Sequence, residues 1–157
     1  MQLDNGTYID WWPQGNGPYS PYGYYPARSD PDSQTLEGNI YMENGVSPDF
    51  AIKITGLDED AIQKWWDSFR SDPNNEWNVL LQNCSSIVAD ALAVGGADKV
   101  LGPYYWIESF DYSVWTPAAA LAYAGMISAT IDSNTMASMF TTYYSFIDID
   151  IDFDLLD

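Results

Sequence analysis

Apolar residues in the middle of the chain repeat at intervals of three and four. After Cys84 they fall at Ile87, Val88, Ala91 and Leu92. This spacing places side chains on one face of an α-helix. Asn83 is a favoured N-cap, and the Gly95-Gly96 pair supplies the left-handed residue that ends many helices. The pattern therefore predicts a helix that begins at Cys84 and ends before Gly95.

Two further helices are predicted from caps and spacing. In the segment 57–70, Asp58 can cap a helix whose first turn is acidic. Its apolar stripe consists of Ile62, Trp65, Trp66 and Phe69. Thr116 and Pro117 are a hydroxyl cap and a proline at the first helical position, so a third helix is expected from Ala118 to about Ser128.

Other segments alternate between apolar and polar residues, which is typical of strands. Asn5-Gly6 is a strong hairpin signal between residues 1–3 and 7–13, and the short first arm suggests a truncated start. Segments 38–45 and 49–56 are predicted to be strands, as is the acidic C-terminal segment 142–155. Residues 14–34 are rich in Gly, Pro, Ser and Tyr and predict a long loop.

The C-terminal segment carries a row of carboxylates opposite its apolar face. The row is Asp148, Asp150, Asp152 and Asp154. Carboxylate oxygens bind hard cations, but a straight strand spaces alternate side chains by about 7 Å, which spreads the ligands apart. The alternative is a solvated acidic face that prevents pairing with another chain. We predict no metal site and no cofactor.

Charge and length limit the classes of function. A chain of 157 residues fits one α+β domain spanning residues 1–157. With 23 acidic and 5 basic residues the net charge is -18. Nucleic acid would be repelled, whereas a cationic partner would be attracted. No membrane span is expected, and no signal peptide is visible. The aromatic content is more than a small core needs, which leaves room for a ligand or a homo-oligomer contact.

Cys84, the sole cysteine, has two interpretations. At a helix start the free amide groups and the helix dipole stabilise a thiolate, which is a better nucleophile than a thiol. Alternatively, Cys84 is a small apolar residue that begins a core helix. A cysteine nucleophile of the papain type needs a base, usually histidine, and this sequence contains no histidine.

Aromatic residues flank the start of the long loop. Trp11, Trp12, Tyr24 and Tyr25 are candidates to line a groove for a sugar or peptide. The alternative, which we prefer, is that the loop aromatics fasten the loop to the domain.

The segment NVLLQNCSSIVADALAVGGA resembles the nucleophile helix of circularly permuted papain-like proteins, the NlpC-type superfamily that includes the lecithin:retinol acyltransferase branch. The resemblance implies an antiparallel sheet packed against the Cys84 helix and two further helices. It implies Cys84 as nucleophile, Asn83 and Ser85 as its helix-start neighbours, and Asp10 as the polar group that orients the base. The base itself, expected on the first strand, has no match.

The sequence thus predicts a homologue of thiol peptidases, amidases or acyltransferases that is inactive as this chain alone. Peptide, peptidoglycan or acyl groups are the expected substrates, and a secreted or effector-like protein is favoured. Either a histidine precedes Met1 in a longer protein, or the scaffold has lost its chemistry. The alternative class is a non-catalytic, acidic, aromatic-rich protein that binds a ligand or assembles with itself.

Overall fold

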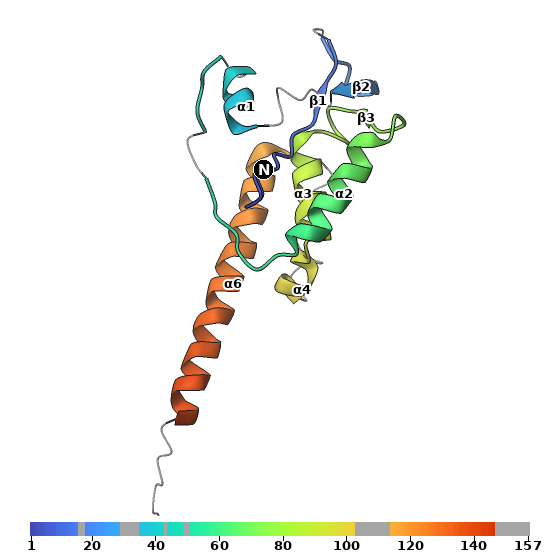
Figure 1. Cartoon of the computed structure of the whole chain (residues 1–157). Coiled ribbons are helices and arrows are strands. Elements are labelled where there is room, and N and C mark those ends of the chain that lie inside the picture. The colour runs from blue at the N-terminus through green and yellow to red at the C-terminus, as the bar shows by residue number, and fades with distance from the viewer. Residues whose placement is uncertain (16–17, 29–34, 43, 49–50, 103–113, 147–157) are drawn as a thin grey trace, which may run out of the picture.

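A computed structural model describes residues 1–15, 18–28, 35–42, 44–48, 51–102 and 114–146 (Figure 1). Within these residues the fold is α+β, with five helices and a small three-stranded antiparallel sheet. The helices are α1 (Leu36–Met42), α2 (Glu59–Ser71), α3 (Cys84–Val94), α4 (Ala97–Leu101) and α6 (Pro117–Phe146). The strands are β1 (Trp12–Pro13), β2 (Tyr25–Arg28) and β3 (Glu76–Trp77).

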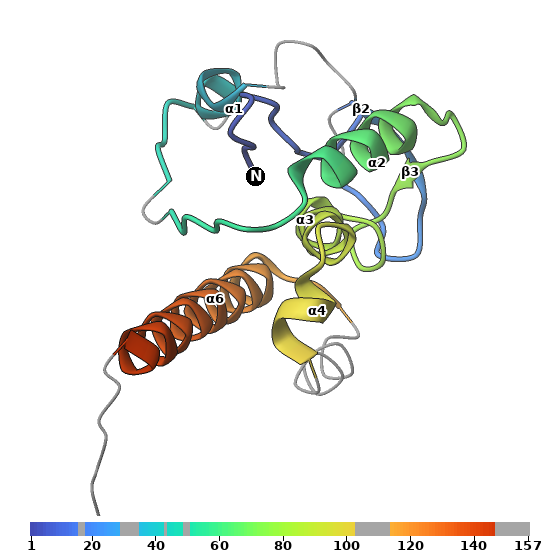
Figure 2. The same ribbon diagram turned by 60° about the horizontal axis from the view of Figure 1, so that its bottom comes forward.

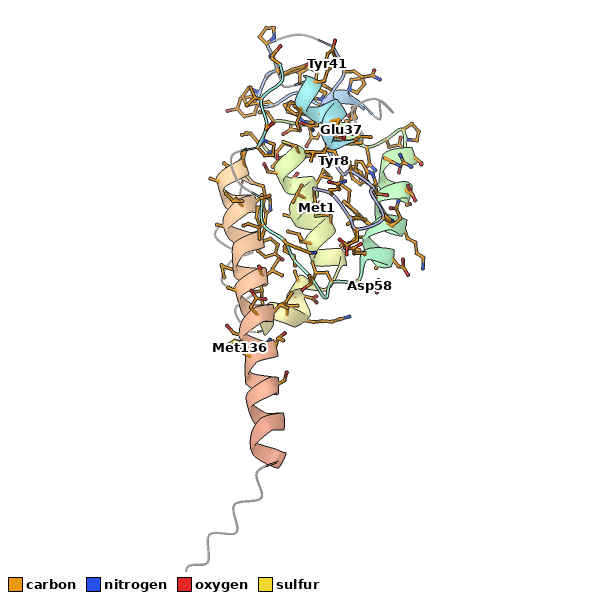
Figure 3. The ribbon with its side chains drawn as sticks, turned by 60° about the vertical axis from the view of Figure 1, so that its left-hand side comes forward. Met1, Tyr8, Glu37, Tyr41, Asp58 and Met136 are labelled. Atoms are coloured by element: carbon orange, nitrogen blue, oxygen red, sulfur yellow. The ribbon has the colours of Figure 1, made fainter. Side chains whose placement is uncertain are left out.

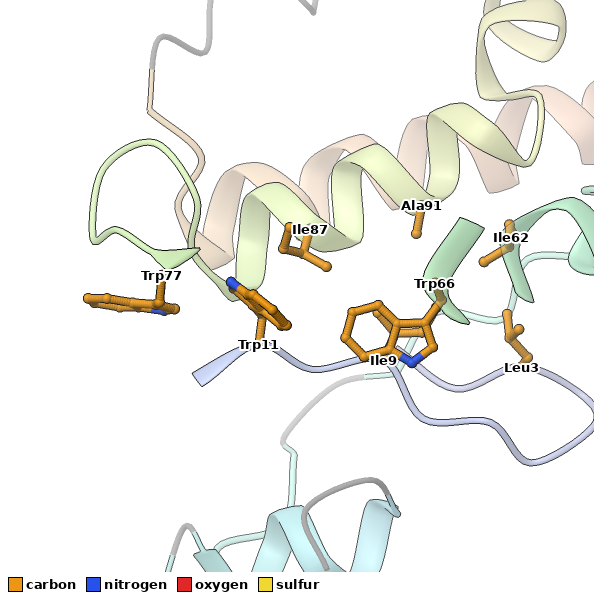
Figure 4. Packing of buried hydrophobic residues seen from close by; sticks show 8 residues of the cluster. All are labelled: Leu3, Ile9, Trp11, Ile62, Trp66, Trp77, Ile87 and Ala91. Atoms are coloured by element: carbon orange, nitrogen blue, oxygen red, sulfur yellow. The ribbon is translucent and has the colours of Figure 1, made fainter. Parts of the chain in front are cut away.

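Helix α3 lies between α2 and α6, as Figures 1 and 2 show from two directions. One apolar cluster joins α2, α3 and the N-terminal hairpin, and Figure 4 shows its members. They are Leu3, Ile9, Trp11, Ile62, Trp66, Trp77, Ile87 and Ala91. A second cluster joins α3, α4 and α6 through Leu92, Leu101, Tyr123 and Ile127, among others. Helix α3 therefore contributes to both halves of the core.

Local signals correctly predicted α2 and α3. Asp58 Oδ1 accepts a 2.9 Å hydrogen bond from the backbone N–H of Ala61, which caps α2. The turn after α3 lies close to α2. A Cβ added at Gly95 would lie only 2.7 Å from Ile62 Cδ1, so a residue without a side chain is needed there. Gly96 follows with a φ of +99°, the left-handed conformation that glycine adopts without strain.

The predicted N-terminal hairpin is present. Leu3 N–H donates to Thr7 O at 2.9 Å, Ile9 N–H donates to Met1 O at 2.7 Å, and the turn between the arms contains Gly6. Ile9 is 1% exposed and belongs to the core cluster, so this arm packs against α2 and α3 (Figure 4).

The sheet lies in the order β1-β2-β3. Trp12 pairs with Arg28, and Tyr25 pairs with Trp77. The central strand β2 falls within residues 14–34, which were predicted to be loop throughout, so that prediction is wrong at residues 25–28. The pattern missed β2 because its partners are distant in sequence. Pro26 has no backbone N–H to donate, but its carbonyl oxygen still joins the sheet by accepting a 2.7 Å hydrogen bond from Gln14 N–H.

Three predicted strands are not found. Residues 38–42 lie in helix α1, which begins after Thr35, whose Oγ1 accepts a 3.0 Å hydrogen bond from Gly38 N–H. Residues 51–55 are irregular and run beside α6, where Ser128 Oγ donates to Lys53 O at 3.2 Å. Residues 142–146 are the end of α6, and the remainder of the predicted acidic strand lies outside the described residues.

Helix α6 is far longer than its predicted end near Ser128. Its first half packs against α3 and α4, while its second half extends beyond the body of the domain (Figure 1). Every side chain from Asp132 to Ser138 is exposed. No helix in the described part of the chain has the length and apolar character needed to cross a bilayer.

Candidate functional site

Cys84 is the first residue of α3, and its side chain is half-buried. Ile87 lies three residues later on the same helix face and packs in the cluster that contains Ile9 and Trp11. The thiol is therefore at the N-terminal end of the helix face that the hairpin covers. It is neither midway along the helix nor enclosed in the apolar core.

Asn83 caps this helix with its side chain. Its Oδ1 accepts hydrogen bonds from Ser85 N–H at 2.8 Å and Ser86 N–H at 3.0 Å, and Ser86 Oγ accepts from Asn83 N–H at 2.9 Å. The cap thus occupies two of the amide groups that a thiol site would use. Among the described residues no acceptor contacts Cys84 N–H.

Asp10 follows Ile9 on the second arm of the hairpin and is 7% exposed. Asn39 Nδ2, on helix α1, donates a 3.2 Å hydrogen bond to Asp10 Oδ2, and the Trp12 side chain also favours the ionised carboxyl group. Burial raises the pKa of Asp10 from 3.8 to about 6, whereas these two side chains and the charge of the Met1 amino group oppose the rise. Asp10 thus takes up a proton at a higher pH than an ordinary aspartate, around pH 6.

The amino group of Met1 relates Asp10 to Cys84. It donates a 2.8 Å hydrogen bond to Ile9 O and is buried, which lowers its pKa from 8.0 to about 6. The electrostatic effects of Asp10 and Cys84 partly offset this decrease in the pKa of the amino group. Both side chains are therefore near enough to the Met1 amino group to influence its charge. Figure 3 shows Met1 below Tyr8, and Tyr8 below Glu37 of helix α1. The Met1 amino group is therefore influenced by both residues predicted as nucleophile and orienting group.

The four predicted aromatic residues occupy different environments. Trp11 is 2% exposed and packs edge-on against Trp66 and Phe69, so its ring belongs to the core. Trp12 is partly exposed beside Asp10, and Tyr24 is 53% exposed.

Tyr25 packs edge-on against Tyr19 with ring centroids 4.9 Å apart, and its hydroxyl accepts a 2.8 Å hydrogen bond from Ser20 N–H. Tyr19 and Tyr25 also pack against Trp77, with ring centroids 5.3 Å and 6.4 Å away, so these two tyrosines link the loop to strand β3. Of the four, Trp12 and Tyr24 present ring surface to solvent.

Two asparagines were missed by sequence reasoning. Asn78 is 1% exposed, and its Oδ1 accepts hydrogen bonds from Leu80 N–H at 2.9 Å and Leu81 N–H at 2.8 Å. Its Nδ2 donates to Gly23 O at 2.8 Å, which ties the long loop to the segment before Cys84. The turn formed by an Asn side chain was a readable local signal. The role of Asn39 could not be predicted from a local sequence pattern, because its partner Asp10 is 29 residues away.

No group of three or more potential metal ligands occurs within the described ranges. The predicted row from Asp148 to Asp154 lies outside them.

Comparison with known proteins identifies one family. The model of the IcsB middle domain matches residues 26–142, which include β2, the Cys84 helix and most of α6. Asp10 precedes the matched range. No solved structure matches the chain.

Two similar curated proteins are very large toxins. The multifunctional-autoprocessing repeats-in-toxin of Vibrio cholerae serotype O1 (strain ATCC 39315 / El Tor Inaba N16961) is 44% identical over 68 residues, which are 43% of this chain. The protein of the same name from Vibrio vulnificus is 44% identical over 85 residues, or 54% of this chain. The matched segments amount to about 1% of the length of these relatives.

Proposed function

Because the chain belongs to the IcsB middle domain family, whose match includes Cys84, we propose that it is the thiol-bearing part of a bacterial toxin or effector. In this proposal the scaffold is a permuted papain-like fold, and Cys84 transfers acyl groups as a thiol peptidase, amidase or acyltransferase does. The names of the Vibrio relatives support the toxin or effector context.

One observation carries the chemical part of the proposal: the half-buried thiol of Cys84 lies at the first position of α3, and both Cys84 and Asp10 act electrostatically on the Met1 amino group. The thiolate attacks a carbonyl carbon, a thioester forms, and the leaving group departs with a proton. The amide of Cys84 is the donor available to the developing oxyanion. Water or an amine then attacks the thioester and releases the thiol.

The 157 residues contain no histidine, so the base has to come from outside them. Asp10 has the surroundings expected of a group that orients an imidazole: it is buried and accepts a hydrogen bond from Asn39. A longer protein carrying a histidine before Met1 would complete the site. Added imidazole is a substitute that can be tested directly.

The first experiment measures the rate at which iodoacetamide labels Cys84 at pH 7, in the native chain and in urea. An activated thiol should react at least about tenfold faster in the native chain, because an exposed but unactivated thiol reacts at its intrinsic rate. Cys84→Ser is the blank, since the chain has no other cysteine. Equal or slower native labelling would support a purely structural Cys84.

The second experiment supplies the missing base. The chain is incubated with p-nitrophenyl acetate and increasing imidazole, and intact mass reports the acetyl thioester. The rate of thioester formation should rise with imidazole in the wild type more than in Asp10→Ala. The same slope in both proteins would remove Asp10 from the proposed site.

A second function is favoured by the exposed tyrosines. Tyr22 is 88% exposed and Tyr41 is 82% exposed, and neither ring contributes to the core. A non-catalytic module that binds a cationic partner through these rings and the acidic surface is consistent with the net charge of -18. Slow labelling of Cys84 would favour this class.

A further inference from the structure

Helix α1 places one polar side chain on the buried carboxyl group of the hairpin. Thr35 caps α1 through Oγ1, and Thr35 O accepts a 2.9 Å hydrogen bond from Asn39 N–H. The first turn of the helix is thereby fixed, and the half-buried Asn39 directs Nδ2 to Asp10 Oδ2 at 3.2 Å. This contact joins helix α1 to the carboxyl group of the hairpin.

We propose that Asn39 is a positioning residue: its side-chain amide orients the Asp10 carboxylate toward the base that works with Cys84. The inference rests on the function proposed above. Asp10 and Asn39 come from different elements, so the orientation of the carboxylate depends on α1 being folded against the hairpin. An amide donor suits this role because it stabilises a carboxylate without supplying a competing charge.

A simple docking role for Asn39 predicts a different result. If Asn39 only fastens α1 to the domain, its removal would expose Asp10 to water, and the pKa of Asp10 would fall toward its ordinary value. If Asn39 acts on the carboxylate of a site that stays buried, the lost hydrogen bond destabilises the ionised form, and the pKa of Asp10 rises. The direction of the change therefore separates the two roles.

Few charged groups surround Asp10 in the described part of the chain. The amino group of Met1 and Cys84 share its electrostatic environment, and Glu37 is exposed two residues before Asn39 on α1. None of these is altered in Asn39→Ala, so a change in the Asp10 titration reports on the amide. Asn39→Gln keeps a longer amide donor and tests rescue.

The experiment follows the side-chain carboxyl ¹³C signal of Asp10 by NMR from pH 4 to about pH 8. The titration midpoint should rise in Asn39→Ala and return toward the wild-type value in Asn39→Gln. An unchanged or lowered midpoint overturns the proposal. Asn74→Ala is the matched control, because Asn74 Nδ2 donates to Asp72 Oδ1 at 2.8 Å in an exposed turn.

A second measurement applies to the proposed chemistry. Imidazole-dependent acetylation of Cys84 should be about tenfold slower in Asn39→Ala and unchanged in Asn74→Ala. If wild-type Cys84 is not acetylated at all, the proposed function fails, while the titration still decides whether Asn39 acts on Asp10. If acetylation occurs equally in Asn39→Ala and the wild type, the positioning role fails alone.

Discussion

Asn83 Nδ2 donates a 3.0 Å hydrogen bond to the carbonyl oxygen of Trp115, so the residue that caps α3 is also bonded to a residue two positions before α6. The same amide donates to Val79 O at 2.9 Å, and the whole side chain is 8% exposed. Asn83 therefore connects three segments of the chain around Cys84. Few other side chains could supply both the cap acceptor and two donors from one position.

Asn83→Ala is expected to lower the free energy of unfolding by about 3 kcal/mol. About 1 kcal/mol comes from the lost cap, and the rest from leaving the carbonyl groups of Val79 and Trp115 without this donor in a partly buried site. Urea denaturation followed by circular dichroism measures the change. Asn83→Ser, which keeps a cap acceptor but loses both donors, should fall between the two proteins. A loss below about 0.5 kcal/mol in Asn83→Ala would contradict this account.

The cap at Asn83 also explains why the sequence predicted α3 well. Capping and the spacing of Ile87 and Ala91 act between residues a few positions apart, and the same holds for Asp58 in α2. Strand β2 could not be read in this way, because its partners Trp12 and Trp77 lie in distant parts of the chain.

The short apolar run at residues 40–42 illustrates the ambiguity between helix and strand. It fits either structure, and only the Thr35 cap, which the pattern analysis overlooked, identifies α1. For the candidate site, the position of Cys84 was predictable from local signals. The contact of Asn39 with Asp10 depends on tertiary packing and was not.

Asp10→Asn should stabilise the chain at neutral pH. The pKa of Asp10 is about 6 in the folded chain and 3.8 when unfolded, so the folded state holds the proton more tightly. The free energy of unfolding therefore falls as pH rises through this interval, by at most about 3 kcal/mol. Asparagine is neutral throughout and avoids this cost.

Urea midpoints at pH 4 and pH 7.5 test this prediction. The advantage of Asp10→Asn over the wild type should be absent at the lower pH and largest at the higher pH. Other carboxyl groups titrate in both proteins, so most of their contribution cancels in the difference. If the wild type instead gains on the variant as pH rises, the ionised Asp10 is a stabilising group, and the assigned direction of its pKa is wrong.

Replacing a side chain of α6 by alanine should affect the free energy of unfolding very differently at two positions. Ile127 is fully buried in the cluster with Leu92, Leu101 and Tyr123, whereas Met136 is 57% exposed on the part of the helix that extends beyond the body (Figure 3). Ile127→Ala is expected to cost about 3 kcal/mol, because it removes apolar contacts and leaves a cavity. Met136→Ala should change the free energy of unfolding by less than about 0.5 kcal/mol.

Urea unfolding of both variants at two protein concentrations gives the comparison. Alanine is the better helix former, so any effect at Met136 on the helix alone should be slightly favourable. A cost at Met136 that approaches the cost at Ile127 would mean that the extended part of α6 is packed in solution. If that cost also grew with protein concentration, a second copy of the chain would be the packing partner, because only self-association makes the stability of a pure protein depend on its concentration.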